Sequence, residues 1–381
     1  MGTRVDLVYF NAGGGHRASA LALQQAIGAA GLDWDVRLVN LTELLDPNGR
    51  LRRLAFSPED YYNARLAHGL TLGLRAELRV LQALIALLHP TLVRALRAHW
   101  RRSAPDLVVS LIPNFNRALH ASLREVHAHV PYVTVLTDLA DHPPHFWIEP
   151  GLDQHLVCGT PQAVRQALAA GCAPQRVHAS SGMIIRPDFY APAAASARAA
   201  RRAELGLDAD APTAVVMFGG HGSRSMVGIA ERLSSHQQIL LCGHNAALRE
   251  RLLALPGGAP RAVLGFTADV AGLLRAGDYF VGKPGPGALS EALHLGLPVI
   301  VTRNAWTMPQ ERYNTQWVVE HGYGRVLRSF REVEPAAREL CAQLPAYRER
   351  VAGLRNRAVF EVPQILQRIV ADAPRGVRAA A

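Results

Sequence analysis

The feature that most constrains the fold is a pattern that occurs once in each half of the chain: an apolar strand, a cluster of glycines, then a helix. It reads LVYFNAGGGHRAS in the first half and VVMFGGHGSRS in the second. Further apolar runs of strand length alternate with helical segments after both, as at residues 106–113 and 132–139. Such alternation is typical of parallel sheets covered by helices. We therefore predict an α/β protein with two domains of similar architecture.

The alternation also suggests where the domains begin and end. An alanine-rich stretch, residues 191–207, interrupts it and is typical of a helical or loose connection. We predict an N-terminal domain over 1–190, a linker over 191–210 and a C-terminal domain over 211–345. Residues 346–381 are predicted to be helices that pack back toward the N-terminal domain.

Composition excludes several classes of protein. A length of 381 residues allows two hydrophobic cores, and 49% hydrophobic with 19% charged residues is ordinary for a soluble protein. No apolar run approaches the ~20 residues that span a bilayer, and the N-terminus lacks signal-peptide architecture. The 4 cysteines are scattered without a CxxC pair, which predicts reduced thiols in a cytoplasmic protein. No acidic cluster has metal-ligand spacing, so we predict neither a metal nor a cofactor.

Charge is concentrated in one stretch. The net charge is +10, and residues 50–102 hold ten arginines against three acidic residues. Leucines recur there at helical spacing, so the stretch predicts either helices with a solvated arginine face or an amphipathic surface on anionic lipid. For the second interpretation, the arginines that we expect at the membrane are Arg52, Arg53, Arg75 and Arg79.

Two glycine turns in the second half point to phosphate binding. They occupy residues 219–223 and 283–287, each between a strand and a helix, where backbone N–H groups and the helix start favour an anion. The second turn carries Lys283, the only lysine in the chain. Two converging turns could hold a diphosphate, although each is also explained as an ordinary strand–helix connection. Polar residues that follow suit a ribose and a sugar, which donate and accept hydrogen bonds: Glu291, Gln310, Glu311 and Asn314.

The first half offers candidates for the chemistry. The glycines before His16 match a dinucleotide fingerprint, but the second strand ends at Asn40, where that fingerprint expects an acid. Polar groups also follow the strand at 132–139, namely Asp138, His142 and Trp147. Such groups at the carboxyl end of a parallel strand are in the usual place for ligands. A capping or packing role for His16 and a buried structural role for Asp138 are the alternatives.

At this point the sequence resembles a known family. The segments GGGHRAS, GFTADVAGLLRAGDYFVGKPGPGALSEALHLGLPVIV and PQERYNTQWVVEHGYG are similar to motifs of monogalactosyldiacylglycerol synthases and their diacylglycerol glucosyltransferase relatives. The wider group includes the N-acetylglucosaminyltransferase of peptidoglycan lipid intermediates. These are inverting glycosyltransferases of the GT-B fold, in which two Rossmann-like domains face each other across a cleft. The resemblance runs from about residue 6 to about residue 325.

The resemblance implies a role for each matching residue. His16 would be the general base, with Asp138 as the alternative, and a neutral imidazole is expected because His16 lies at a positive helix start. Phe266 and Thr267 would border uracil, Glu291 the ribose, and Gln310, Glu311 and Asn314 the donor sugar. The diphosphate would contact Gly219, Gly220, His221, Gly222, Ser223, Lys283, Gly285 and Gly287. The acceptor side would include Gly14, Gly15, Asn114, His142 and Trp147.

The implied activity is hexose transfer from UDP-galactose or UDP-glucose, galactose being favoured, to diacylglycerol. The product would be a β-glycosyl glycerolipid, made by a peripheral protein on the inner face of the cell membrane. The UDP-sugar is a co-substrate. Two details depart from the family: only Ala140 and Asp141 separate TDL from His142, and Pro284 stands where relatives often have alanine. The alternatives are a polyprenyl-linked or soluble acceptor, or a nucleic-acid or dinucleotide-binding protein. A nucleic-acid partner is disfavoured because basic and aromatic residues are not interleaved along a sheet.

Overall fold

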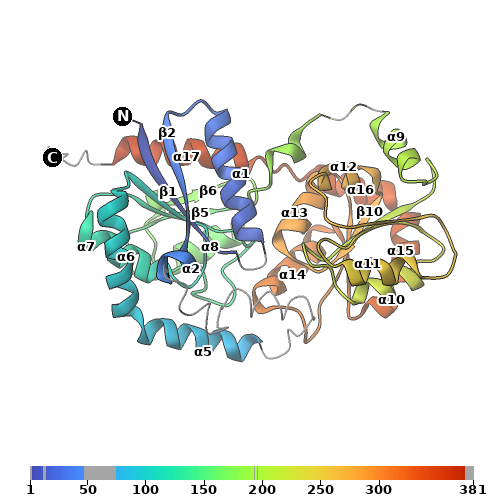
Figure 1. Cartoon of the computed structure of the whole chain (residues 1–381), viewed down its shortest axis with the longest axis horizontal. Helices are drawn as coiled ribbons and strands as arrows, with labels where there is room; N and C mark the ends of the chain where they lie inside the picture. Colours follow the sequence, from blue (N-terminus) through green and yellow to red (C-terminus); the bar gives the residue numbers. More distant parts are fainter. Residues whose placement is uncertain (1, 12–13, 47–73, 193, 195, 374–381) are drawn as a thin grey trace. The chain divides into compact units, whose positions relative to one another are not determined.

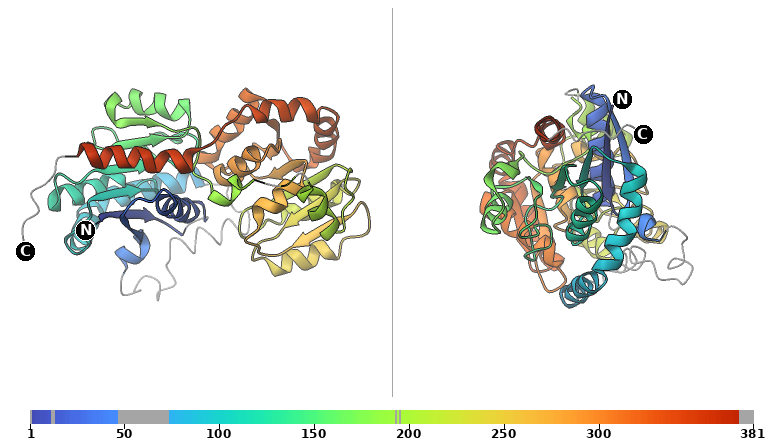
Figure 2. Two further views of the ribbon diagram at one scale, coloured as in Figure 1. Left: turned by 90° about the horizontal axis from the view of Figure 1, so that it is seen from above. Right: turned by 90° about the vertical axis from the view of Figure 1, so that its left-hand side faces the viewer.

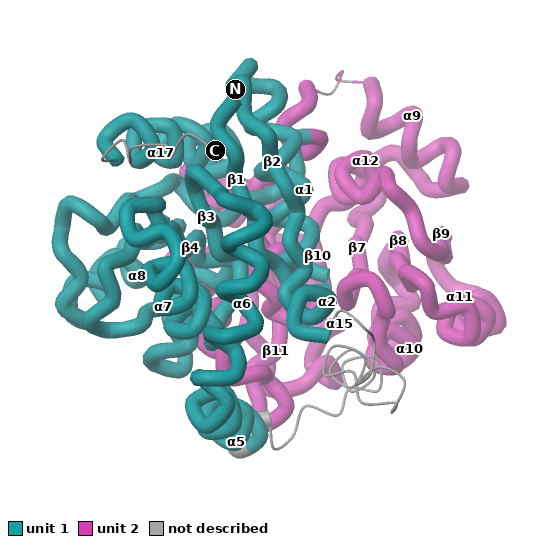
Figure 3. The backbone as a smooth tube through the Cα atoms, turned by 60° about the vertical axis from the view of Figure 1, so that its left-hand side comes forward, with its two compact units in different colours: residues 1–61, 73–187, 357–381 teal, residues 62–72, 188–356 magenta. Residues whose placement is uncertain are grey.

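A computed structural model describes residues 2–11, 14–46, 74–192, 194 and 196–373. The described residues form two compact units, coloured separately in Figure 3. Unit 1 contains those up to 187 and the C-terminal segment from 357, and unit 2 contains 188–356. Each unit has its own six-stranded sheet, as expected from the repeated sequence pattern.

The sheet of unit 1 has the strand order β2-β1-β3-β4-β5-β6, and neighbouring strands are parallel. The chain leaves β1 toward one edge to form β2 and then returns to the other side of β1 to form β3. The order therefore reverses between β1 and β3, which is where open α/β sheets bind ligands. The strands are β1 (Thr3–Tyr9), β2 (Trp34–Asn40), β3 (Leu107–Ser110), β4 (Tyr132–Val135), β5 (His155–Cys158) and β6 (Val177–Ala179).

Helices cover this sheet, and one of them comes from the far end of the chain. The C-terminal helix α17 packs against α1 and runs along the body of unit 1 (Figure 2). Its start is fixed by the Glu361 carboxylate, which accepts the Ser181 N–H at 2.7 Å. The helices are α1 (Gly15–Ala29), α2 (Leu41–Leu45), α5 (Leu74–Leu87), α6 (His89–Ser103), α7 (Asn116–Val126), α8 (Pro161–Ala169) and α17 (Ala358–Asp372).

The sheet of unit 2 has the order β12-β11-β10-β7-β8-β9, again with parallel neighbours. Here the order reverses between β7 and β10. The strands are short and mostly apolar because both faces are covered by helices; for example, every residue of β7 is buried. They are β7 (Thr213–Met217), β8 (Gln237–Leu241), β9 (Arg261–Leu264), β10 (Tyr279–Gly282), β11 (Val299–Thr302) and β12 (Gly324–Leu327).

The helices of unit 2 begin with α9, which lies inside the stretch interpreted as a linker. Arg202 of α9 is fully buried, and its guanidinium donates to the Asp278 carboxylate at 2.7 Å. The same carboxylate pairs with Arg198 and Arg348, so α9 is fixed to unit 2. The helices are α9 (Ala197–Glu204), α10 (Ser225–Arg232), α11 (Ala246–Leu253), α12 (Val270–Ala276), α13 (Pro286–His294), α14 (Arg312–His321), α15 (Val333–Ala342) and α16 (Leu344–Ala352) (Figure 1).

Candidate active site

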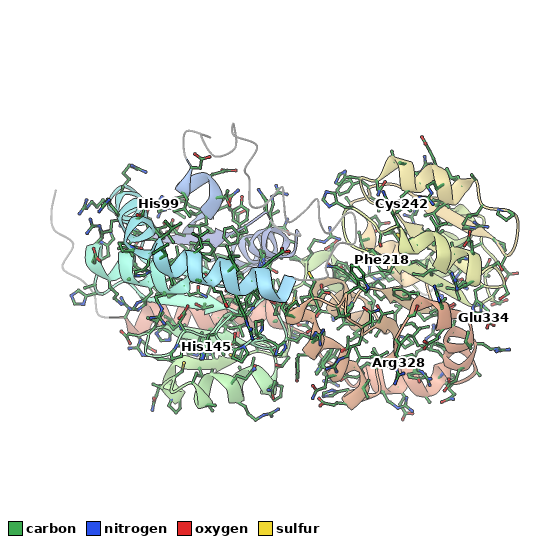
Figure 4. The ribbon with its side chains drawn as sticks, turned by 90° about the horizontal axis from the view of Figure 1, so that it is seen from below. His99, His145, Phe218, Cys242, Arg328 and Glu334 are labelled. Atoms are coloured by element: carbon green, nitrogen blue, oxygen red, sulfur yellow. The ribbon has the colours of Figure 1, made fainter. Side chains whose placement is uncertain are left out.

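The two glycine turns of unit 2 start side by side at the reversal point of its sheet. Met217 at the end of β7 is the register partner of Gly282 at the end of β10. Phe218 (labelled in Figure 4) and Lys283 therefore leave adjacent strands at the same edge. A Cβ at Gly282 would lie 2.4 Å from the Met217 carbonyl oxygen, so this close approach requires glycine. The structure thus brings together the two segments that the sequence predicted as a diphosphate site.

The first turn needs its glycines for backbone geometry. Gly219 and Gly222 have φ angles of 76° and 61°, a left-handed conformation that side chains disfavour. Gly243, at the end of β8, packs so closely that a Cβ there would lie 2.0 Å from the Gly220 carbonyl oxygen. The next residue, His244, donates its N–H to that oxygen at 2.9 Å. The end of β8 therefore fixes the shape of the first turn.

Helices α10 and α13 start beyond these turns without side-chain caps. Neither has an acidic residue in its first turn. The N-cap residue of α10, Arg224, makes no side-chain cap hydrogen bond, and the N-cap residue of α13 is Gly285, which has no side chain. The Ser223 hydroxyl accepts one N–H, that of Ser225, at 3.2 Å. A helix start offers several N–H donors and a partial positive charge. These two starts can therefore stabilise the charge of a phosphate-bearing group.

The second turn is held by residues from the segment after β11. Lys283 donates to the Glu311 carboxylate at 3.0 Å, and the Asn314 amide donates to the Pro284 carbonyl at 2.8 Å. Both Glu311 and Asn314 are buried. Gln310, in the same segment, is half-buried. Of the three residues assigned to the donor sugar, two thus have partners within the turn itself.

An aromatic pair lies beside the first turn. The rings of Phe266 and His244 stack with centroids 4.2 Å apart and planes 16° from parallel, and Phe266 is 66% exposed. Thr267 uses its hydroxyl to accept the Asp269 N–H at 3.1 Å, which shapes the loop that presents Phe266. An exposed, flat ring pair can stack with a base. The sequence predicted Phe266 but missed His244, whose only signal was its position after a strand.

Unit 1 places His16 at the start of α1, at its own reversal point. Gly14, the N-cap residue, has a φ of 79° and turns the chain from β1 into the helix. His16 Nδ1 lies 3.0 Å from the hydroxyl oxygen of Thr137, which follows β4. Burial lowers the pKa of His16 to about 4, although a backbone hydrogen bond with Leu111 opposes the shift. The imidazole is therefore neutral near pH 7, as expected, but burial is the main cause, whereas the sequence argument invoked the helix start.

Asp138 lies next to Thr137 and contacts Trp147. Its carboxylate accepts the indole N–H at 2.9 Å, and the Trp147 ring centroid lies 5.9 Å from that of His16. Asp138 and Trp147 are both buried. Sequence reasoning selected His16, Asp138 and Trp147 separately, and the structure brings these three into one cluster with Thr137.

A second carboxylate, which the sequence did not suggest, shapes the loop that carries Trp147. Asp141 accepts the backbone N–H of Trp147 at 2.6 Å and that of His145 at 2.8 Å (His145 is labelled in Figure 4). Its own N–H donates to Gln166 at 2.9 Å. Asp141 is one of the two residues that separate the TDL segment from His142. The residue that organises this loop therefore lies where the sequence departs from the family pattern.

The remaining acceptor-side candidates lie around this cluster. Gly15 is exposed at the first residue of α1, and His142 is half-buried in the Asp141 loop. Asn114 has a positive φ of 66°, and its side chain accepts from Gln82 of α5 at 3.0 Å. Asn114 thus connects the loop after β3 with α5.

Helix α5 carries an exposed apolar face at the periphery of unit 1 (Figure 1). Arg79 is exposed on α5, whereas Arg52 and Arg53 lie outside the described residues, as does the side chain of Arg75. Within the described residues, no single helix is long and apolar enough to cross a membrane; Glu77–Leu87 and His89–Ser103 meet that test only together, and they are bent by 67°. The apolar face consists of Val80, Leu81, Leu84 and Leu87 together with Leu88, which directly follows α5; they are 68%, 40%, 47%, 77% and 43% exposed.

The described residues contain no group of three or more His, Cys, Asp or Glu side chains that could hold a metal ion. The candidates for charge stabilisation in unit 2 are the two helix starts and Lys283.

Comparison with known proteins identifies the relatives. Residues 16–183 match the monogalactosyldiacylglycerol (MGDG) synthase family. The chain is 27% identical over 397 residues to MGDG synthase 1, chloroplastic, of Arabidopsis thaliana, covering 98% of this chain and 71% of that protein. This chain is a relative of the MGDG synthases. It spans 50% to 72% of the length of the plant MGDG synthases compared with it.

Solved structures establish the fold of this MGDG synthase relative. The glycosyltransferase SnogD from Streptomyces nogalater is 18% identical, with a TM-score of 0.59 over 97% of this chain and 100% of that one. A UDP-GlcNAc 2-epimerase from Neisseria meningitidis, solved with UDP-GlcNAc, is 13% identical with a TM-score of 0.61 over 97% and 100%. The matches confirm the resemblance to the MGDG synthases and support an enzyme of the hexosyltransferase class. The solved structures confirm the GT-B fold with two Rossmann-like domains.

Proposed function

We propose that this protein is an inverting glycosyltransferase that moves a hexose from a UDP-sugar to diacylglycerol, with galactose favoured over glucose. The observation that carries the proposal is the pairing of the two glycine turns at Met217 and Gly282, with uncapped helix starts beyond both. The relatives' names supply the lipid acceptor and galactose.

The donor would bind to unit 2. The diphosphate would accept hydrogen bonds from backbone N–H groups at the starts of α10 and α13. The uracil would stack beside the ring pair of Phe266 and His244. Glu291 lies half-buried on α13, past the second turn, where it would receive the ribose hydroxyls. These assignments use groups that are preorganised, so little reorganisation is needed when charge develops on the leaving UDP.

The reaction would begin at His16. Its neutral imidazole takes the proton of the acceptor hydroxyl as the hydroxyl oxygen forms a bond to the anomeric carbon. The bond between that carbon and the diphosphate oxygen breaks, and UDP leaves with its charge met by the two helix starts and Lys283. Attack from the face opposite UDP gives the β-glycoside. Asp138 is the alternative base, and the scheme assigns no step to a metal or cofactor.

The acceptor is a lipid, so we propose that unit 1 rests on the cytoplasmic face of the cell membrane. The exposed apolar face of α5 would enter the interface, while Arg79 and the arginines at 52, 53 and 75 attract anionic headgroups. Support comes from the exposure of Val80 and Leu87, which are 68% and 77% exposed. Transfer of such large apolar side chains out of water is favourable.

Mass spectrometry of glycolipids tests the proposal. The full chain is incubated with vesicles containing diacylglycerol and with an equal mixture of UDP-galactose and UDP-glucose, with and without EDTA. We expect hexosyl diacylglycerol in both samples, and separation of its sugar head group then identifies the hexose. If neither UDP-sugar yields a glycolipid while a soluble or polyprenyl-linked acceptor is glycosylated, the lipid acceptor is wrong.

A further inference from the structure

A pocket of about 630 Å³ lies in unit 1, at the amino ends of β4, β5 and β6. Because the strands are parallel, these ends form the edge of the sheet opposite to the one that carries His16 and Thr137. Neither residue lines the pocket, and the proposed reaction uses no part of it. Its charged and imidazole-bearing side chains include Arg124, Asp153, His155, Arg176, His178 and Arg368.

Two of these side chains, His155 of β5 and His178 of β6, form a hydrogen-bonded imidazole pair. His178 is the register partner of Val157, so both rings project from the same face of the sheet. His155 Nδ1 lies 3.0 Å from His178 Nε2. The ring centroids are 5.3 Å apart and the planes differ by 23°, which is the arrangement of two rings joined edge to edge by an N–H···N bond.

The protons of this pair determine what it can offer to a ligand. Two neutral imidazoles carry two N–H groups between them, and one of these is used in the bond between the rings. The outer nitrogens, His155 Nε2 and His178 Nδ1, therefore share a single N–H. One added proton keeps the bond between the rings and makes both outer nitrogens donors. A second added proton would place an N–H on both facing nitrogens and break that bond.

Guanidinium groups surround the pair. Arg124 donates to three backbone carbonyls around the pocket and lies 3.6 Å from the Asp153 carboxylate. Arg176 pairs with the same carboxylate. Arg368 is exposed on α17, and among the described residues it has no carboxylate within ion-pair distance. One carboxylate thus serves two of the three guanidinium groups, which leaves positive charge for a ligand.

Burial and the nearby cations together disfavour a charged imidazole. Burial, followed by His178 and Arg176, lowers the pKa of His155 to about 4, and Asp153 opposes the shift. Burial and then Arg368 lower the pKa of His178. An anion among the guanidinium groups would act in the opposite direction, because negative charge favours the imidazolium. The other titratable or charged groups that line the same pocket are Arg124 of α7, His129 of the following loop, and Asp372 of α17.

We propose that this pocket binds a doubly charged oxyanion of the phosphate type from solution, and that binding adds one proton to the His155–His178 pair. Guanidinium and imidazolium groups form charge-assisted hydrogen bonds with such oxygens. The proton comes from water, and no covalent bond other than that N–H changes. This site is distinct from the glycine turns of unit 2, so the inference goes beyond the proposed function.

A phosphate group can be presented by a soluble ester or by a lipid headgroup. The face that we assign to the membrane is on α5, whose Gln82 contacts Asn114 after the carboxyl end of β3. The pocket lies at the amino edge of the same sheet. A soluble source is therefore the one that fits, and this choice rests on the proposed membrane contact of α5.

Sulfate is a suitable probe because it stays doubly charged across the pH range of the test. Isothermal titration of the full chain at constant ionic strength, with UDP saturating the proposed donor site, measures sulfate affinity between pH 7.5 and pH 5.5. We expect the affinity to rise as the pH falls, by up to about tenfold per pH unit, the limit for uptake of one proton. The gain should level off near pH 4, where the pKa of free His155 lies.

Titration in two buffers of different ionisation enthalpy counts the protons directly, and uptake should approach one proton per sulfate. Sulfate affinity that does not change with pH, without proton uptake, would overturn the proposed coupling. Sulfate binding that is lost when UDP saturates the chain would place the anion at the glycine turns and overturn the pocket.

Variants locate the site. Arg368→Gln should weaken sulfate binding by about tenfold, whereas Arg165→Gln, which removes an exposed guanidinium on α8 of the same unit, should leave it unchanged. Equal affinity in these two variants would overturn the proposal. The double variant His155→Gln, His178→Gln should lose the pH dependence. Thermal unfolding shows whether each variant folds, and if the double variant does not, the proton count of the native chain decides the coupling.

Competition identifies the source of the anion. Glycerol 3-phosphate should displace sulfate from the native chain and should do so more weakly from Arg368→Gln. Displacement by phosphatidylglycerol vesicles alone, with no effect of glycerol 3-phosphate, would overturn a ligand from solution.

Discussion

At the scale of single residues, the side-chain partner of His16 is a hydroxyl. Its Nδ1 lies 3.0 Å from Thr137 Oγ1, while the nearby Asp138 carboxylate accepts from the Trp147 indole. A histidine base is commonly oriented by a carboxylate, which also stabilises the imidazolium. Here burial disfavours the imidazolium, so the proton taken from the acceptor should be released readily after each turnover.

The first prediction concerns His16→Ala. Because the variant lacks the proton acceptor, turnover should fall by roughly 100-fold or more while UDP affinity stays unchanged. His129→Ala, which replaces an exposed histidine in the loop after α7, is the matched control and should retain full turnover. Initial rates with titration of UDP measure both quantities. Full activity of the His16→Ala variant would indicate that Asp138 is the general base.

The second prediction is the pH dependence of the same step. Burial lowers the pKa of His16 from 6.5 to about 4, and only the neutral form can accept a proton. The acid limb of kcat/KM should therefore lie near pH 4, and the rate should show no loss between pH 7 and pH 5.5. An acid limb near pH 6.5 would contradict the lowered pKa of His16 in the free enzyme.

Individual residues also mark the limit of sequence reasoning. His16, Asp138, Lys283 and Phe266 could be selected because each stands in a motif or directly after a strand. Thr137, Asp141 and His244 could not, since their roles arise from partners that lie far away in the sequence. The partners of Glu311 and Asn314 were equally hidden, because a motif indicates polar groups without their orientation.

At the scale of elements, the strands and helices could be predicted well from apolar runs and glycines, but the strand order could not. Hydrophobic alternation fixes where a strand lies in the chain and leaves open which strands are neighbours. The pairing of β7 with β10, which brings the two glycine turns together, became visible only in the register of Met217 with Gly282.

The third prediction is that Gly243→Ala damages the first glycine turn. The new Cβ would lie 2.0 Å from the Gly220 carbonyl oxygen, and Gly243 has a φ of 59°. We expect a loss of about 1–3 kcal/mol in the free energy of unfolding and at least a tenfold weaker UDP affinity. Gly257→Ala is the control, because nothing lies within 4 Å of its Cβ position. Equal UDP affinity in the two variants would contradict the conclusion that the end of β8 fixes the shape of the first turn.

The fourth prediction tests the anchoring of α9. Asp278→Asn removes the charge that compensates the fully buried Arg202, so the free energy of unfolding should fall by about 3–5 kcal/mol. Glu204→Gln breaks a surface pair in the same helix, where the carboxylate is 62% exposed, and should cost less than about 1 kcal/mol. Chemical denaturation of both variants gives the comparison. A similar small loss in each would mean that α9 is only loosely attached.

At the scale of the whole molecule, attachment to lipid and turnover should be separable. Val80 and Leu87 are exposed on α5, and neither belongs to the His16 cluster. The double variant Val80→Gln, Leu87→Gln should bind vesicles roughly tenfold or more weakly, since each side chain contributes on the order of 1 kcal/mol when buried in the interface.

Co-sedimentation with vesicles tests this fifth prediction by measuring vesicle binding. Turnover of the double variant on a short-chain, water-dispersed diacylglycerol should stay unchanged. Leu253→Gln, at a 55% exposed position of α11 in unit 2, should leave vesicle binding intact. Equal vesicle binding by all three proteins would exclude α5 as the membrane contact.

The return of α17 to unit 1 determines the order in which the two units can mature during synthesis. Unit 1 is built from two separated stretches of chain, and α1, whose first turn carries His16, packs against α17. A ribosome therefore finishes the whole of unit 2 before the helix that supports α1 exists. Unit 2 can fold first, whereas the packing of α1 in unit 1 is completed only when α17 has emerged. Under the proposed function, a nascent chain would thus complete its donor site before the surroundings of His16.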